Sequence, residues 1–183
     1  MSQAGADHPL SRSWRFWIDE CGQKNASRQT FEATLSKCSA CTSIESFWRA
    51  YAQLPSIELL QNRKVSVHFM EDPIKPLWED EHNINGGMAT VKCDKDCTAC
   101  VWKELLIDLI ATPETKQSEN KLNGLSVTTK KNTNIISFWF NTTDASFWKK
   151  AIHTCTVRYP EIKETDVCWT ENREHIKHNN RQV

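Results

Sequence analysis

The sequence predicts a single α+β domain, built from one antiparallel β-sheet and three helices. The chain has 183 residues, which is enough to bury a sizeable core in one domain. Several segments alternate apolar and polar residues, whereas three others repeat apolar residues at helical spacing. The strand-like segments occur in hairpins between the helices and do not alternate regularly with them, which favours antiparallel pairing over parallel winding.

The first half of the chain predicts two strands, a weaker strand candidate and one helix. Residues 14–18 are aromatic and β-prone, residues 31–36 form the weaker candidate, and residues 64–70 alternate apolar with polar side chains. The helix begins where residues 42–45 match a capping box, and it places Ile44, Phe47 and Trp48 at helical spacing. Pro55 marks the limit of this helix.

The second half predicts two more helices and four short strands. Residues 88–93 form a strand after a double glycine, and residues 98–111 carry an apolar stripe that Pro113 ends. Residues 124–130 and 135–141 predict a hairpin, Asp144 begins the third helix, and residues 166–170 predict a last strand. We expect residues 8–170 to form the folded domain. Residues 1–7 are expected to be a flexible N-terminus, and residues 171–183 a flexible charged tail.

Charge and hydropathy exclude several classes of protein. Lys+Arg and Asp+Glu are equal at 23 each, so any contact with phosphate must be local. Residues 1–7 lack the basic and apolar regions of a signal peptide. The longest apolar run, residues 105–111, contains Asp108 and is too short to cross a bilayer. We therefore expect a cytoplasmic monomer with no membrane contact.

The chain has eight cysteines, and four of them form two C-x-x-C pairs: Cys38 with Cys41, and Cys97 with Cys100. Four thiolates arranged in two such pairs can bind zinc, so a zinc-stabilised interaction module is one alternative. The gap of 55 residues between the pairs is longer than usual, and the glycines typical of zinc knuckles are missing. We therefore interpret the cysteines as free thiols, and expect neither a metal nor another cofactor.

The most informative segment is residues 76–87, which read Pro-Leu-Trp-Glu-Asp-Glu-His-Asn-Ile-Asn-Gly-Gly. Loops are normally polar, so a tryptophan followed by acids is unusual. The face of Trp78 offers stacking and cation–π attraction, and Glu79 can accept hydrogen bonds from ring N–H groups. The pair therefore has the parts to bind a flat, positively charged ring. The alternative is that Trp78 simply folds back onto the core.

Five segments together resemble the translation initiation factor 4E family of messenger-RNA cap-binding proteins. They are His8-Pro9-Leu10 with Trp14 and Trp17, residues 44–48, residues 76–87, residues 101–106, and residues 124–130 with Trp139. The resemblance covers about residues 8 to 170. It implies a strongly curved antiparallel sheet with three helices packed on its convex face, and a cap site on the concave face.

The resemblance implies that the base of 7-methylguanosine lies between two aromatic rings. Trp78 matches one ring. Phe31 is the candidate for the other, where the family has a tryptophan. Glu79 matches the acid that accepts from N1 and N2 of the base. Trp139 matches the tryptophan that contacts the N7-methyl group, and core packing is its alternative interpretation.

The resemblance also implies cationic contacts to the cap phosphates, and here the sequence departs from the family. Lys130 matches one phosphate-binding position, and Lys131 lies beside it. Met88 and Ala89 stand where the family has arginine and tryptophan. Fewer cations mean fewer charge-assisted hydrogen bonds, so we expect a weaker phosphate contribution than in a typical member.

A second surface is implied for a partner, either a 4G-type scaffold or a 4E-binding protein. Such partners lay a Tyr-x-x-x-x-Leu helix on the dorsal side of the family fold, with apolar anchors in a groove. The matching residues are His8, Pro9, Leu10, Ile44, Trp48, Glu104 and Ile110. Lys103 stands where an aliphatic residue is usual, so the partner's motif is expected to differ from the common one.

We therefore expect a divergent, non-enzymatic cap-binding protein that acts in cap-dependent translation initiation. The departures suggest adaptation to an unusually modified cap. The alternatives are a cap-binding repressor that recruits no productive scaffold, the zinc module, and a cap hydrolase. No HxE motif, Ser/His/Asp set or paired carboxylates support the hydrolase.

Overall fold

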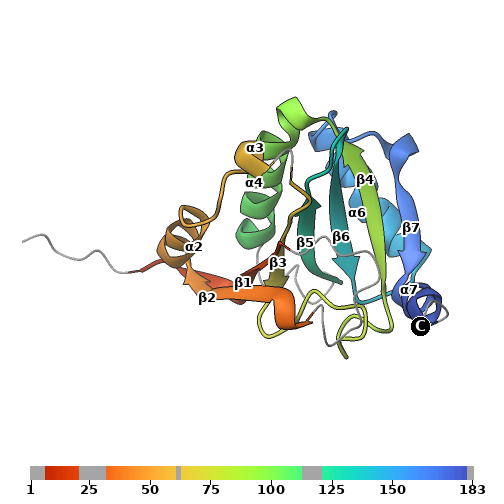
Figure 1. The fold of residues 1–183 in the computed structure, drawn as a ribbon, viewed down its shortest axis with the longest axis horizontal. Helices are drawn as coiled ribbons and strands as arrows, with labels where there is room; N and C mark the ends of the chain where they lie inside the picture. Colours follow the sequence, from red (N-terminus) through yellow and green to blue (C-terminus); the bar gives the residue numbers. More distant parts are fainter. Residues whose placement is uncertain (1–6, 21–31, 61–62, 113–120, 181–183) are drawn as a thin grey trace, which may run out of the picture.

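Seven strands form one antiparallel sheet in the computed structural model, which describes residues 7–20, 32–60, 63–112 and 121–180 (Figure 1). The strand order is β2-β1-β3-β5-β6-β4-β7, so β2 and β7 are the two edges. The strands are β1 Pro9–Asp19, β2 Leu35–Ser43, β3 Ser66–Glu71, β4 Gly87–Cys93, β5 Leu122–Thr128, β6 Asn134–Phe140 and β7 Cys168–Glu171. All six strand pairings are antiparallel.

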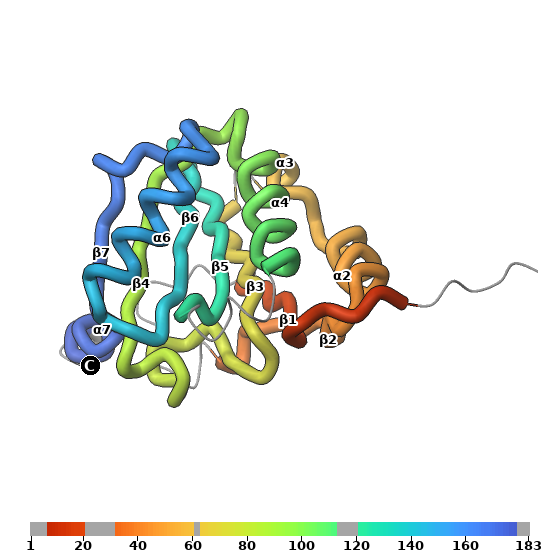
Figure 2. The backbone as a smooth tube through the Cα atoms, turned by 180° about the vertical axis from the view of Figure 1, so that it is seen from behind, coloured from red at the N-terminus to blue at the C-terminus, as the bar shows by residue number. Residues whose placement is uncertain are grey.

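The long helices lie behind the sheet. The helices are α2 Ile44–Tyr51, α3 Ile57–Leu60, α4 Lys95–Ala111, α6 Ala145–Arg158 and α7 Asn172–Asn180, with a 3₁₀ turn, η1, at Glu164–Asp166. Figures 1 and 2 show α4 and α6 on the convex side and α2 beside β1 and β2. In both views α7 lies at the β7 edge of the sheet. The predicted fold class is confirmed.

Two apolar clusters occupy opposite faces of the sheet. The larger one fills the space between the sheet and the helices, and its ring contacts include Trp14 stacked on Phe69 with centroids 5.2 Å apart. The smaller one lies on the other face and consists of Trp17, Met70, Ile74 and Trp139, with Leu35, Trp78 and Met88 packed against it. Because side chains alternate along a strand, Phe138 and Phe140 of β6 belong to the larger cluster, whereas Trp139 between them belongs to the smaller one.

Helix α2 has the predicted capping box, but shifted by one residue. Ser43 is the N-cap: its hydroxyl accepts from the Ser46 backbone N–H at 3.1 Å, and the Ser46 hydroxyl accepts from the Ser43 N–H at 2.8 Å. Glu45, which the predicted box would use, instead accepts two hydrogen bonds from His8. The weaker strand candidate at 31–36 is displaced to β2, which begins at Leu35.

Residues 172–180, which were expected to belong to a flexible tail, form α7. Asn172 is fully buried at the start of this helix. Its backbone N–H donates to the Gly86 carbonyl at 3.0 Å, and its side-chain amide donates to the Asn83 carbonyl at 2.7 Å. These bonds fasten the end of the chain to the loop before β4. Residues 1–6 of the predicted N-terminal segment lie outside the described residues.

The described part of the chain contains no helix that is long and apolar enough to cross a membrane. Within the same residues, no three His, Cys, Asp or Glu side chains are grouped to hold a metal ion. Cys38 and Cys41 lie on β2, whereas Cys97 and Cys100 lie on α4, and all four are free thiols. The zinc alternative therefore finds no support among the described cysteines.

Candidate functional site

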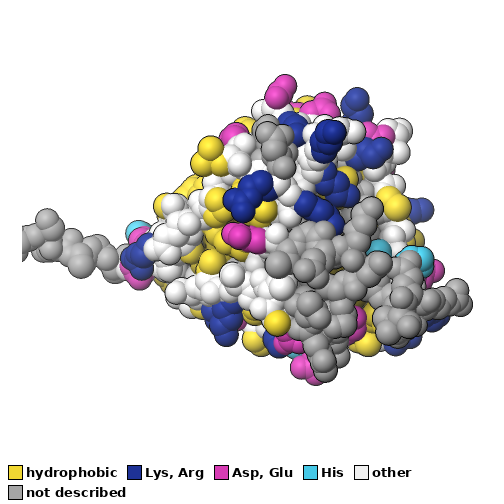
Figure 3. All heavy atoms as spheres, viewed as in Figure 1, with side chains coloured by type: hydrophobic (Ala, Val, Ile, Leu, Met, Phe, Trp, Pro, Cys, Tyr) yellow, Lys and Arg dark blue, Asp and Glu magenta, His cyan; other side chains and the backbone are white. Residues whose placement is uncertain are grey.

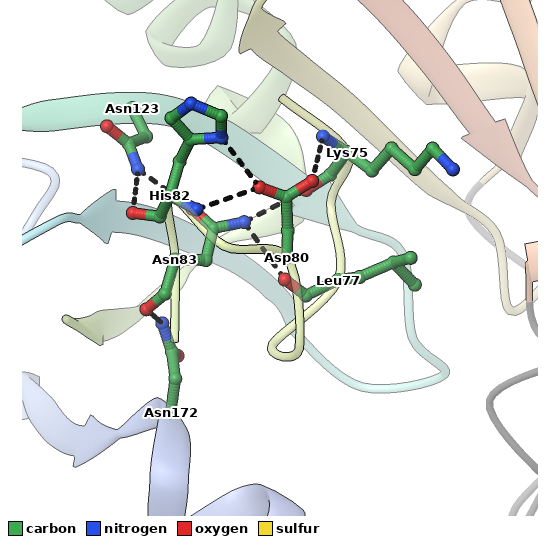
Figure 4. Close-up of polar contacts among 7 residues, drawn as sticks. All are labelled: Lys75, Leu77, Asp80, His82, Asn83, Asn123 and Asn172. Carbon is green, nitrogen blue, oxygen red and sulfur yellow. Dashed lines mark hydrogen bonds and ion pairs between the residues drawn. The ribbon is translucent and has the colours of Figure 1, made fainter. Parts of the chain in front are cut away.

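The Trp78 loop, which joins β3 to β4, is held by three buried asparagines (Figure 4). The Asn83 side-chain amide donates to the carbonyls of Lys75 and Leu77, each at 2.9 Å. Asn123 of β5 donates to the Asn83 side-chain oxygen at 2.9 Å, and Asn172 donates to the Asn83 carbonyl at 2.7 Å. Buried polar groups are costly unless they are hydrogen-bonded, so this network fixes the backbone on both sides of Trp78.

The double glycine at the end of the loop allows a close approach to neighbouring strands. A Cβ atom on Gly86 would lie 1.8 Å from the carbonyl oxygen of Phe140, and one on Gly87 would lie 2.4 Å from a ring carbon of Trp169. Since real Cβ atoms do not approach so closely, only glycine fits at either position. The sequence signal of a loop ended by Gly-Gly therefore reflects how the loop is packed onto the sheet.

Trp78 is half-buried and stacks on His175 of α7, with ring centroids 4.3 Å apart and 10° between the planes. It also packs against the smaller apolar cluster that contains Trp139. Its indole nitrogen is buried and has no hydrogen-bond partner among the described residues. Trp78 therefore neither joins the main core nor projects freely into solvent: one ring face is covered by α7.

Glu79 lies next to the stacked tryptophan and is also half-buried. Within the described residues its carboxylate has no hydrogen bond or ion pair, in contrast to Asp80, which accepts from the backbone N–H groups of Lys75 and His82 at 3.1 and 3.0 Å. An ionised carboxylate has two oxygens that can each accept a donor. Because Trp78 and Glu79 are adjacent in the chain, one ligand can stack on the indole and donate a pair of N–H groups to the carboxylate.

Trp139 is 4% exposed on β6, and its indole nitrogen donates to the Ser126 hydroxyl at 2.7 Å. The same hydroxyl lies 2.6 Å from Nδ1 of His68 on β3. His68 is fully enclosed, and desolvation lowers its pKa to about 3, so the imidazole is neutral at physiological pH. The network fixes the orientation of Trp139 in the smaller cluster. Neither Ser126 nor His68 was predicted as a site residue.

Lys130 and Lys131 are exposed beside the turn between β5 and β6. Figure 3 shows Lys and Arg side chains gathered on this face over the ends of β4, β5 and β6. Trp139 pairs with Gly124, and Lys130 lies six positions further along the chain, or about 20 Å if the chain is extended at ~3.3 Å per residue. The lysines are therefore placed to reach groups well beyond a base bound near Trp139.

Met88 and Ala89 face opposite sides of the sheet. Met88 pairs with Trp139 across β4 and β6 and packs against the smaller cluster, whereas Ala89 is fully buried in the larger core. Met88 thus adds apolar surface beside Trp78, at the position where the family places a cation.

Phe31 lies outside the described residues, but its neighbour Glu32 is described. The Glu32 carboxylate forms an ion pair with the Lys75 ammonium group in the Trp78 loop. The chain immediately after Phe31 therefore contacts this loop, close to Trp78.

The predicted dorsal residues lie on β1, α2 and α4. Ile44 and Trp48 are 42% and 41% exposed on one face of α2, whereas the adjacent Phe47 is fully buried. His8 donates its backbone N–H to the Glu45 carboxylate at 2.9 Å, and its ring lies 2.7 Å from the other carboxylate oxygen. These hydrogen bonds hold the pKa of Glu45 at about 2.

The other dorsal residues differ in exposure. Pro9 is exposed and Leu10 half-buried at the start of β1. Glu104 and Ile110 are half-buried on α4, and Ile110 packs against the main core. Lys103, also half-buried, lines a cavity of about 440 Å³ between α3 and α4.

Comparison with known proteins decides the family. The sequence model of the family described as "Eukaryotic initiation factor 4E" matches residues 9–183, nearly the whole chain. The chain belongs to the eukaryotic initiation factor 4E family. The match includes the segment of α7, which the resemblance seen in the sequence did not reach.

Relatives of this 4E family member include plant and amoebal initiation factors. "Eukaryotic translation initiation factor NCBP" of Arabidopsis thaliana is 31% identical over 135 residues, which is 73% of this chain and 58% of the relative. Initiation factor 4E of Dictyostelium discoideum is 29% identical over 171 residues, or 93% of this chain and 66% of the relative. The chain thus spans roughly three-fifths to two-thirds of the length of these relatives.

Solved structures share the fold of this 4E family member. C. elegans eIF4E-3, in complex with the 4E-binding protein Mextli and a cap analogue, aligns with a TM-score of 0.78 and 21% identity over 94% of this chain and 96% of its own. Ascaris suum eIF4E-3 in complex with an m7G cap aligns with a TM-score of 0.74 and 23% identity over 91% and 92%. At such identities the likeness shows the fold.

Proposed function

We propose that this 4E family member binds the 7-methylguanosine cap of messenger RNA and acts in cap-dependent translation initiation in the cytoplasm. The observation that carries the proposal is the Trp78–Glu79 pair, a stacking surface beside a carboxylate that has no partner among the described residues, on a loop fixed by buried asparagines. The function is binding without catalysis, since each assigned group recognises the base or the phosphates.

In the proposed complex, the methylated base lies on the face of Trp78 that does not contact His175, and Phe31 supplies the second ring. Stacking contributes ~1–3 kcal/mol per base, and the positive charge of the methylated ring adds cation–π attraction of up to about 2 kcal/mol when desolvated. Guanine without the methyl group loses the second contribution. Glu79 accepts from N1 and N2, because two parallel N–H donors match its two oxygens.

Trp139 is proposed to contact the methyl group, and Lys130 and Lys131 the phosphates. The hydrogen bond to Ser126 holds the Trp139 ring in one orientation, which a methyl contact requires. Met88 stands where the family has an arginine, so the proposed phosphate contacts are the exposed lysines of the β5–β6 turn. We therefore expect phosphates to add less affinity than in a typical family member.

The dorsal face is proposed to bind a 4G-type scaffold or a 4E-binding protein. Ile44 and Trp48 are one helical turn apart and exposed, which is how an apolar groove presents anchors to an amphipathic helix. Two solved relatives support both halves of the proposal: C. elegans eIF4E-3 was solved with Mextli and a cap analogue, and Ascaris suum eIF4E-3 with m7G and m2,2,7G caps.

Retention on immobilised 7-methyl-GTP tests the proposal. The purified protein should be retained, should elute with free 7-methyl-GTP, and should resist elution by GTP at the same concentration. Trp78→Ala should pass through the resin. Elution by GTP and 7-methyl-GTP at equal concentrations would remove the basis for cap recognition.

A further inference from the structure

The C-terminal helix α7 contacts the Trp78 ring of the proposed cap site through His175. This imidazole lies flat on the Trp78 indole at 4.3 Å, while Arg173 on the same helix donates to the Asn85 side chain of the Trp78 loop. His175 is partly buried, and desolvation lowers its pKa, so it is neutral at physiological pH. A stacked aromatic pair of this kind restricts the tryptophan to one orientation.

The position of α7 in the fold indicates which face of Trp78 is covered. Helix α7 follows β7, at one edge of the sheet, and both ribbon views place it beyond that edge (Figures 1 and 2). The ion pair between Glu32 and Lys75 approaches the same loop from the chain leading into β2, at the opposite edge. The face of Trp78 under His175 therefore lies on the β7 side of the loop, whereas the Glu32–Lys75 ion pair reaches the loop from the chain that leads into β2.

Helix α7 is anchored too firmly to act as a cover that a ligand displaces. Asn172 is fully buried and donates hydrogen bonds to the carbonyls of Gly86 and Asn83. The bond to Asn83 is part of the asparagine network that fixes the Trp78 loop. Lifting α7 would leave these buried amide groups unpaired, which is unfavourable because buried polar groups need hydrogen-bond partners.

We propose that His175 is a positioning residue that backs Trp78, so that a bound base completes a three-ring stack of imidazole, indole and base. This role rests on the proposed cap binding. The backing fixes the indole before the ligand arrives, and binding therefore does not have to immobilise it. A neutral ring in this position also leaves the indole free to attract the positive charge of the methylated base from its other side. Two neighbours on the same helix act on the pKa of His175 in opposite directions: Glu174 raises it and His178 lowers it.

Three variants of the full chain test the role: His175→Ala removes the backing ring, His175→Phe keeps a flat ring, and His178→Ala removes an exposed histidine from the same helix. Calorimetry should show His175→Ala binding 7-methyl-GTP about 3- to 10-fold more weakly, as the loss of one aromatic pair predicts. His175→Phe and His178→Ala should stay within about twofold of the parent, a difference well below the effect of one aromatic pair.

Hydrogen exchange of the unliganded proteins gives a second readout that does not depend on cap binding. Residues 76–86 should exchange faster in His175→Ala than in His175→Phe or in the parent. Tighter binding by His175→Ala would show that His175 competes with the ligand, and unchanged affinity and exchange would show that it does not position Trp78. If the parent does not bind 7-methyl-GTP, the proposed function fails, while the exchange comparison still decides whether His175 backs the loop.

Discussion

Replacing Glu79 with glutamine changes one atom of the side chain and should weaken cap binding strongly. The carboxylate is half-buried beside Trp78 and has no partner among the described residues, so it is available for two N–H donors of a bound guanine. Glutamine keeps one acceptor oxygen but presents an NH₂ group where the second acceptor is needed. The variant therefore loses the negative charge and one hydrogen bond to the base. It also places the glutamine NH₂ group opposite an N–H group of the guanine, so that two donors face each other.

The size of the effect follows from these losses. A hydrogen bond to a charged group contributes about 1.5–3 kcal/mol, and every ~1.4 kcal/mol changes affinity tenfold. We therefore expect Glu79→Gln to bind 7-methyl-GTP about 10- to 100-fold more weakly. Since no described residue is bonded to this carboxylate, the folded protein should be as stable as the parent.

Calorimetric titration with 7-methyl-GTP measures this loss, and thermal unfolding checks the fold. Glu81→Gln is the matched control, because it removes the same charge from an exposed position in the same loop. The control should bind within about threefold of the parent, as expected for a screened surface charge. Equal losses in the two variants would show that Glu79 acts only through the general field of the loop, and no loss in Glu79→Gln would refute base recognition by this residue.

Three further predictions concern the dorsal face, the phosphates and acid stability. Trp48→Ala should weaken binding of a Tyr-x-x-x-x-Leu peptide by about 30-fold or more, as expected for a tryptophan at the centre of an interface. The affinity for 7-methyl-GTP should not change. Loss of both peptide binding and 7-methyl-GTP binding would refute the assignment of Trp48 to the dorsal face. Met88→Arg should raise the affinity for 7-methyl-GTP about tenfold, because the arginine can form a charge-assisted hydrogen bond to phosphate. The affinity for 7-methylguanosine, which has no phosphate, should not change. An equal gain in affinity for both ligands would contradict a phosphate contact. Because burial lowers the pKa of His68 to about 3, its contribution to stability is complete above pH ~6.5 and is lost as pH falls toward 3, by about 1.4 kcal/mol per pH unit. Urea unfolding at pH 7 and pH 5 should show this loss in the parent and a smaller one in His68→Asn.

The sequence predicted the Trp78 loop because its signal is local. A tryptophan and acids in a loop ended by two glycines stand out against ordinary loop composition, and the spacing of the surrounding segments matches the family. The capping box of α2 was also visible, although the chain uses Ser46 where Glu45 was expected. Patterns of this kind depend only on residues that are close together in the sequence, so they can be recognised without the fold.

The supports of the site could not be predicted, because they join residues far apart in the chain. Asn172 bonds to Asn83 across 89 positions, and nothing in a charged, polar C-terminal segment marks it as buried. The alternation of β3 and β5 predicts that His68 and Ser126 face the same side as Trp139, but not that the three side chains meet. His175 had no periodic or motif signal, and only the packing of α7 against the loop reveals it.

The ratio of the dissociation constants for GTP and 7-methyl-GTP, measured by calorimetry on the same protein preparation, tests cap recognition most directly. Cation–π attraction of about 1–2 kcal/mol predicts that the methylated nucleotide binds roughly 5- to 30-fold more tightly. Trp78→Ala should lose this preference together with most of the affinity. Equal affinity of the parent protein for the two nucleotides would contradict the proposed recognition of a methylated, positively charged base.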